Sequence, residues 1–239
     1  LRHCIWRFAL ANQEIEREYS SLIRNDRVLT VSQFDVNIFN ECNNFITKHV
    51  SYEIFDAGMI QCMKQILSYY EKKTNRILSD YHYLLSIPLV IAFSELKFLM
   101  INPGELIGFY HRIQDTVKIF DPLVGMTAKQ DEAYLNHQVS SVLEILANYD
   151  NDLLTKITSF FGGSHSWQSP DDRHNRIQQS FALIIKKFVE SLGFNLLNVD
   201  VTLFVWDQIF LKVTPSPDEL YRVFCILLLC EKEELMMIN

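Results

Sequence analysis

The chain has 239 residues, of which 49% are hydrophobic and 13% aromatic, with only 7 Gly and 6 Pro. This composition is typical of a packed globular protein and excludes a disordered or fibrous one. The formal net charge of -7 excludes the basic surface that binding to nucleic acid or to an anionic membrane requires.

Apolar residues spaced three and four positions apart predict amphipathic helices, because this spacing places them on one face. Three stripes have this period: Ile60, Met63, Ile66, Leu67 and Tyr70; Leu135, Val139, Val142, Leu143, Leu146 and Tyr149; Ile177, Phe181, Ile184, Ile185, Phe188 and Leu192. Alternating strand patterns are nearly absent. The sequence therefore predicts an all-α fold.

Helix ends are legible as well. Breaks fall at residues 102–104 (N-P-G), at Asp121-Pro122 and at residues 162–166 (G-G-S-H-S). The residue runs 169–172 (S-P-D-D) and 216–219 (S-P-D-E) each place a Ser cap, a Pro and acidic residues as at a helix start.

The apolar run 199–210 could be a buried strand, but a cap at Asp200 and the polar pair Asp207-Gln208 favour a helix. Because Asp207 lies within an apolar run, it needs a partner when it is buried, and we expect a cap or a salt bridge with Arg or Lys.

We expect one domain over residues 1–239, with an N-terminal lobe 1–161 and a C-terminal lobe 176–239 joined by the polar loop 162–175. No repeat of fixed period is present. Since the chain begins at Leu1 rather than Met, we expect a domain from a longer protein.

Motifs for metal or nucleotide chemistry are absent. His165 and His174 share the polar loop but lack zinc-site spacing, and no G-x-x-x-x-G-K-[ST] loop or G-x-S-x-G elbow occurs. We therefore expect no metal, no cofactor and no catalytic residue of these kinds.

The five cysteines are odd in number, without C-x-x-C spacing, which favours a reducing, cytoplasmic environment. The longest apolar run, 84–93, contains Ser86 and Pro88 and is much shorter than the ~20 residues of a membrane span. We expect no insertion into a membrane.

Two separated segments carry a family resemblance. Residues 1–8 read L-R-H-C-I-W-R-F, with Tyr19 and Leu22 following, and residues 203–210 read L-F-V-W-D-Q-I-F. TBC domains, the helical two-lobed domains of Rab GTPase-activating proteins, have a similar L-R-x-x-[VI]-W start and a late L-R-[LIV]-W-D helix, here with Phe204 in place of Arg. The helix expected over 220–236 resembles the closing helix of that family.

In that family an arginine in I-x-x-D-x-x-R and a glutamine in Y-x-Q-G-M carry activity, and an arginine finger contributes ~10³–10⁵ in rate. Anchoring on Pro88 and Phe93 places Asp80 at the glutamine and Leu78 at the tyrosine. The Gly and Met become Tyr81 and His82. The arginine position falls on Ile38 in one register and on Leu29 in another.

The resemblance thus implies a catalytically inactive TBC-like domain, because neither an aliphatic side chain nor a carboxylate can replace these fingers. It implies a protein-binding or scaffolding module, with a small GTPase or another protein as partner. The candidate partner surfaces are the groove at Ile38, Asp80, Tyr81 and His82, and loop 162–175.

Two alternatives stay open. One is an active Rab GTPase-activating protein in which Arg24, Arg27 or Arg76 replaces the lost arginine. The other is an unrelated α-helical scaffold. Inactive family members work at cilia, centrosomes and in vesicle trafficking, and the chain is compared with the ciliary Broad-minded-type TBC proteins, although no residue motif here anchors that subfamily.

Overall fold

Every regular element that the structure describes is an α-helix, and no strand occurs in that part of the chain, which confirms the all-α class. The structure is a computed structural model of the chain. It describes residues 2–26, 32–50, 57–94, 103–121, 128–162, 181–212 and 214–237.

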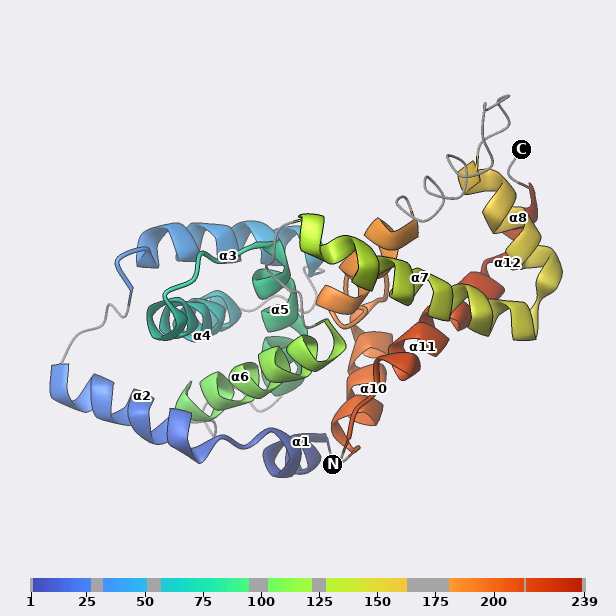
Figure 1. Ribbon diagram of the computed structural model, residues 1–239. Helices are drawn as coiled ribbons and strands as arrows, with labels where there is room; N and C mark the ends of the chain where they lie inside the picture. The colour runs from blue at the N-terminus through green and yellow to red at the C-terminus, as the bar shows by residue number, and fades with distance from the viewer. Residues whose placement is uncertain are drawn as a thin grey trace. The chain divides into compact units, whose positions relative to one another are not determined.

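The helices follow one another as Figure 1 shows. They are α1 (Arg2–Leu10), α2 (Gln13–Asp26), α3 (Asp35–His49), α4 (Ala57–Thr74), α5 (Asp80–Ser94), α6 (Pro103–Phe120), α7 (Ala128–Tyr149), α8 (Asn151–Gly162), α10 (Val199–Phe210), α11 (Pro217–Cys230) and α12 (Lys232–Met237). A further helix covers residues 181–190. The predicted breaks at 102–104 and at Asp121 fall at the two ends of α6.

The chain divides into two compact units. The first consists of Leu1–Val117 and Phe194–Thr214, and the second of Lys118–Gly193 and Pro215–Asn239. This division differs from the predicted lobes 1–161 and 176–239. The physical reason is that α10 packs against α1 and α5, which returns a late segment of the chain to the first unit.

The predicted apolar stripes form the buried faces of the helices that carry them. All five residues of the first stripe are buried on α4, from Ile60 to Tyr70. On α7, Val139, Val142 and Leu146 are buried, whereas Tyr149, the last residue of the stripe, is 68% exposed at the helix end. Ile177 lies outside the described residues.

The core of the first unit is aromatic. The fully buried ring of Trp6 contacts Phe93, Trp206 and Phe210 at centroid separations of 6.0, 5.9 and 5.5 Å. These rings come from α1, α5 and α10, and aromatic pairs at such separations stabilise a core beyond their buried area.

Asp207 fixes α1 to α10. Its carboxylate accepts hydrogen bonds from Arg2 Nε at 3.0 Å and Nη2 at 2.9 Å, and from Trp6 Nε1 at 2.8 Å. The expected salt bridge with an arginine is therefore confirmed. The two segments that carry the family resemblance, 203–210 and 1–8, meet at this carboxylate.

Helix capping agrees with the sequence at α11 and differs at α10. Ser216 caps α11, and its hydroxyl accepts from Asp218 N. Residues 199–210 form a helix, as expected, but the predicted cap at Asp200 is wrong. The cap is Asn198, whose side chain accepts from Val201 N at 2.9 Å, while Asp200 lies in the first turn.

The second unit is built around α7, α8, α11 and α12 and the helix 181–190. Phe224 of α11 contacts Phe181 and Phe188 at 5.8 and 5.2 Å, and Lys232 donates to Asp150 at 2.5 Å. α11 packs against α7, and α12 packs against α8. Helix packing and the Lys232–Asp150 pair thus connect the helices on both sides of residues 163–180.

The apolar run 84–93 lies within α5. Ten of its fifteen residues are buried, including Pro88, because α5 packs against α3, α4 and α10. Its apolar composition on all sides therefore belongs to a core helix. In the described part of the chain, no helix has both the length and the apolar character needed to cross a bilayer.

Candidate functional site

A cavity of about 260 Å³ opens where α3 and α5 begin, and most of its wall is apolar. Its lining residues come from the start of α3, the last turn of α4, the connector 75–79 and α5: Phe34, Asn37, Ile38, Glu71, Ile77, Leu78 and Tyr83. α3, α4 and α5 pack against one another, which holds these residues together.

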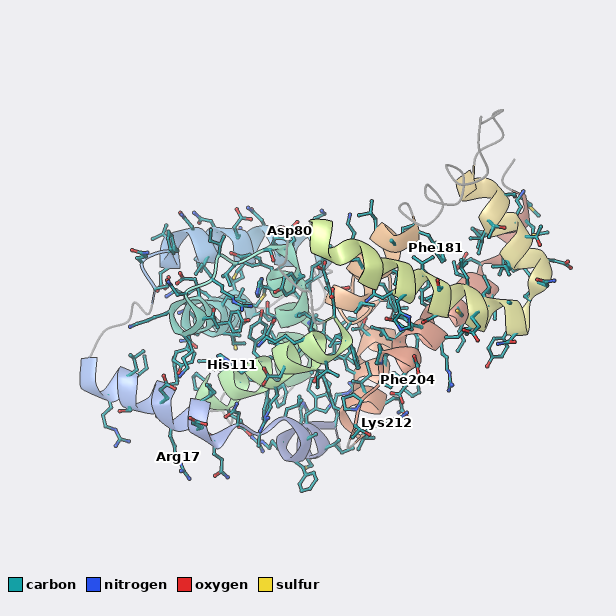
Figure 2. The ribbon with its side chains drawn as sticks, in the orientation of Figure 1. Arg17, Asp80, His111, Phe181, Phe204 and Lys212 are labelled. Carbon is teal, nitrogen blue, oxygen red and sulfur yellow. The ribbon has the colours of Figure 1, made fainter. Side chains whose placement is uncertain are left out.

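The cavity brings together two of the positions that the family resemblance singled out. Ile38, aligned with the arginine, and Leu78, aligned with the tyrosine, both line it. Asp80, aligned with the glutamine, is the first residue of α5 and is exposed (Figure 2). Leu29, the other candidate for the arginine position, lies outside the described residues.

The start of α3 is fixed by reciprocal hydrogen bonds. Ser32 Oγ accepts from Phe34 N at 3.0 Å, and Asp35 Oδ1 accepts from Ser32 N at 2.9 Å. This arrangement resembles a capping box but lies in the turn before α3, whose N-cap, Phe34, makes no side-chain cap bond. Ser32 Oγ also donates to Glu71 Oε2 at 2.5 Å, which connects this turn to α4.

Asp35 also pairs with Lys64 of α4. Burial raises the pKa of Asp35, but the ion pair with Lys64 and the hydrogen bond from Ser32 N hold it below its usual value. Asp35 is therefore ionised at neutral pH, and the buried ion pair places α3 against α4 beside the cavity.

At the start of α5, a histidine side chain, rather than an acidic one, accepts the hydrogen bond from the backbone N–H. Ser79 N donates to His82 Nδ1 at 3.0 Å, and His82 N donates to Ser79 O at 2.9 Å. Because Nδ1 accepts this bond, the ring is neutral and carries its proton on Nε2. Burial, together with the nearby Arg76 charge, lowers the pKa of His82 to about 4.

The backbone of His82 is also held from α6. Tyr110 is fully buried and donates its hydroxyl to His82 O at 2.9 Å, while Gln114 Nε2 donates to the Tyr110 hydroxyl at 2.9 Å. Burial raises the pKa of Tyr110 well above its ordinary value, so the hydroxyl stays protonated and able to donate. This chain of bonds fixes the first turn of α5.

The accessible part of the predicted partner surface is smaller than expected, because two of its four residues are buried. Ile38 and His82 are each only 3% exposed, and His82 serves as a helix cap. Tyr81 is half-buried, with its ring 3.9 Å from that of His82. Of the four predicted residues, Asp80 and part of Tyr81 are accessible, and Ile38 is accessible only as a cavity wall.

The cavity is negatively charged. Glu71 is the one charged residue among its described lining residues. Burial raises the pKa of Tyr83, and the nearby Cys42, Glu41 and Asp80 raise it further. The carboxylates of Glu41 and Asp80 therefore act on the residue that forms this wall of the cavity.

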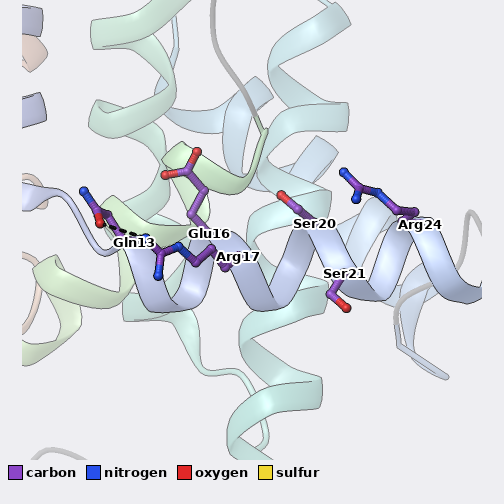
Figure 3. A pocket seen from close by; sticks show the side chains of 6 residues that line it. All are labelled: Gln13, Glu16, Arg17, Ser20, Ser21 and Arg24. Atoms are coloured by element: carbon purple, nitrogen blue, oxygen red, sulfur yellow. Dashed lines mark hydrogen bonds between the residues drawn. The ribbon is translucent and has the colours of Figure 1, made fainter.

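The arginines named as replacements lie elsewhere or outside the described residues. Arg24 lines a separate, polar surface pocket on α2 together with Gln13, Glu16, Arg17, Ser20 and Ser21 (Figure 3). No residue of that pocket lines the cavity. Arg76 is exposed on the connector between α4 and α5, next to Ile77. Arg27 lies outside the described residues.

Sequence reasoning missed most of the cavity wall. Phe34 and Ile77 are 44% and 94% exposed, and each stands one to three residues before a helix begins. An apolar residue placed just outside a helical stripe is the one signal in the sequence that could have indicated them. Glu71 and Tyr83 lie within helices whose apolar pattern is continuous, so nothing in the sequence distinguishes them as cavity residues.

Metal binding finds no support in the described residues, where no group of three or more His, Cys, Asp or Glu side chains could hold an ion. His165, His174 and most of loop 162–175 lie outside the described residues. The cysteines that can be described are free, and burial raises the pKa of Cys42 and of Cys62 to about 12, which makes both unreactive.

Comparison of the chain with protein-family models, with curated proteins and with solved structures finds no match in any of the three. The likeness to TBC domains therefore depends on the segments 1–8, 80–93 and 203–210 of this sequence, and it remains a prediction.

Proposed function

We propose that this chain is a TBC-like domain that does not activate GTPases and acts by binding a protein partner at the cavity between α3 and α5. The observation that carries the proposal is that Ile38 and Leu78, two positions aligned with functional residues of the family, line one apolar cavity. The first partner to test is a Rab-type small GTPase.

The loss of activation follows from the chemistry of the cavity. Transition-state charge on a transferred phosphoryl group is stabilised by cations and hydrogen-bond donors. The aliphatic Ile38 and Leu78 provide neither, and the carboxylates of Glu71 and Asp80 would repel phosphate. Binding through apolar burial is the interaction that such a site supports.

Binding and catalysis can be measured separately. The domain is titrated against a panel of GTP-loaded Rab-type GTPases, and single-turnover GTP hydrolysis is followed for each. We expect micromolar or tighter binding to at least one GTPase without faster hydrolysis. Faster hydrolysis would refute the loss of activation, and binding to no member of the panel would refute a Rab-type partner.

Filling the cavity tests where the partner binds. Asn37 is an exposed residue of α3 that lines the cavity, so Asn37→Trp should occupy part of its volume and weaken binding at least tenfold. Asn40→Trp is the matched control, because Asn40 is exposed on the same helix and does not line the cavity. Equal effects of the two variants would place the binding site elsewhere.

An active protein with displaced fingers is the competing function. It predicts faster hydrolysis by the wild-type chain and loss of that effect in Arg24→Ala, Arg27→Ala or Arg76→Ala. The ciliary, centrosomal or vesicle-trafficking setting belongs to the same proposal, since it comes from the family resemblance alone.

A further inference from the structure

The volume and walls of the cavity define what can enter it. Its 260 Å³ exceeds the ~150 Å³ of an apolar cavity that binds benzene and falls below the ~300–1,000 Å³ of a site for a drug-sized ligand. This volume suits one or two bulky side chains. Ile38 and Tyr83 form buried walls, whereas Phe34 and Ile77 are exposed and can contact a chain outside.

The charged residues near Tyr83 at the opening of the cavity are acidic. Asp80 stands three residues before Tyr83 on α5, and Glu41 stands one turn after Asn37 on α3; both are exposed, and both raise the pKa of Tyr83. Glu71, an acidic residue on the wall, accepts a hydrogen bond from Ser32.

Two cations among the described residues lie near this part of the cavity, and each acts on other groups. Lys64 is committed to the buried Asp35. The charge of Arg76 acts on Tyr70 and His82, and no cation is among the groups that act on Tyr83. Among the described residues, a chain that enters the cavity past Tyr83 therefore meets the carboxylates of Glu41 and Asp80, while Arg76 stands beside Ile77.

We propose that the cavity binds a protein segment in which a bulky apolar side chain is flanked by Lys or Arg. The apolar side chain is buried between Ile38, Leu78 and Tyr83, and the flanking cations pair with Asp80 and Glu41. This inference rests on the proposed function, because it specifies the partner of the same cavity. Apolar burial supplies most of the affinity, and the charges select the partner.

Labelled peptides test the proposal without a known partner. Three ten-residue peptides share a central Leu-Phe and differ in four flanking residues, which are Lys, Gln or Glu. By fluorescence anisotropy at low salt, we expect the Lys peptide to bind roughly tenfold more tightly than the Glu peptide, with the Gln peptide between them. At 1 M NaCl, where the Debye length is about 3 Å, this preference should largely disappear.

Charge neutralisation identifies the groups responsible. The double variant Asp80→Asn with Glu41→Gln should weaken binding of the Lys peptide two- to fivefold and leave the Gln peptide unchanged. The control is Asp200→Asn with Glu14→Gln, which changes the net charge equally at exposed first-turn residues of α10 and α2. Asn37→Trp should abolish binding of all three peptides, and Asn40→Trp should not.

Equal binding of the Lys and Glu peptides, or equal effects of the two double variants, would overturn the inference. If a GTPase of the panel still binds and is lost with Asn37→Trp, the proposed function stands while the preference for a cationic segment fails. If no GTPase binds but the Lys peptide does, the cationic segment stands and the Rab-type partner fails.

Discussion

Replacement of His82 by Asn should remove a pH-dependent part of the stability of the first unit. His82 Nδ1 accepts from Ser79 N at the start of α5, and the ring is 3% exposed. An Asn side chain can supply a similarly placed acceptor through its Oδ1 but does not titrate. The variant should therefore keep most of the cap and lose the pH dependence.

The magnitude follows from proton linkage. The ordinary histidine pKa of 6.5 and the value of about 4 in the fold differ by about 2.5, which at about 1.4 kcal/mol per unit is about 3 kcal/mol. Between these two values the unfolded chain binds a proton that the folded chain does not. The contribution of His82 is therefore fully present above pH 6.5 and is lost as the pH falls from 6.5 to 4.

Urea denaturation at pH 7.5, 6, 5 and 4, followed by far-UV circular dichroism, measures this difference. The free energy of unfolding of the wild type should fall by about 3 kcal/mol more than that of His82→Asn over this range. His49→Asn is the comparison: partial desolvation and the Lys48 charge also lower the pKa of His49, but its side chain is largely exposed at the end of α3, so this variant should keep most of the wild-type pH dependence. Parallel pH profiles of wild type and His82→Asn, or an NMR titration of His82 near 6.5, would refute the reasoning.

Three further substitutions test the packing. Asp207→Leu leaves the buried Trp6 Nε1 without an acceptor and should lower the free energy of unfolding by about 3 kcal/mol, measured by urea denaturation. Gln138→Leu replaces a buried amide that has no hydrogen-bond partner among the described residues and should raise thermal stability, by about 1–2 kcal/mol; a loss would mean that the amide is paired. Lys64→Met leaves the Asp35 carboxylate buried without its cation, should destabilise the fold by about 3–5 kcal/mol, and should raise the pKa of Asp35 in an NMR titration.

The parts of the fold that follow from local chemistry could be predicted from the sequence. The spacing of the stripe from Ile60 to Tyr70 predicts a helix that is buried on that face, and this helix is α4. Ser216 and Pro217 define a helix start by hydrogen bonding and backbone geometry within four residues. Asp207 could be expected to have a cationic partner, because a charge in an apolar run is costly when unpaired.

The remaining features depend on contacts between distant residues. Asn198 rather than Asp200 caps α10, and this choice was within reach of the sequence, since an Asn directly before the apolar run is an equally good cap. The sequence could not identify Arg2 as the partner of Asp207, because 205 positions separate the two residues. The division into two units depends on α10 returning to α1 and α5, which no local pattern records.

The burial of Ile38 has a consequence for the proposed function beyond the identity of one side chain. An arginine at this position would have to leave water for a cavity whose walls are Leu78, Tyr83 and the carboxylate of Glu71. Burial of a guanidinium against the apolar Leu78 and Tyr83 is costly even beside Glu71, so a working finger would require a wetter, more open site. Under the proposed function, the apolar walls and the absent fingers are therefore one coupled change: the side chains that bury a partner's apolar residue are those that exclude the hydrated cation on which activation depends.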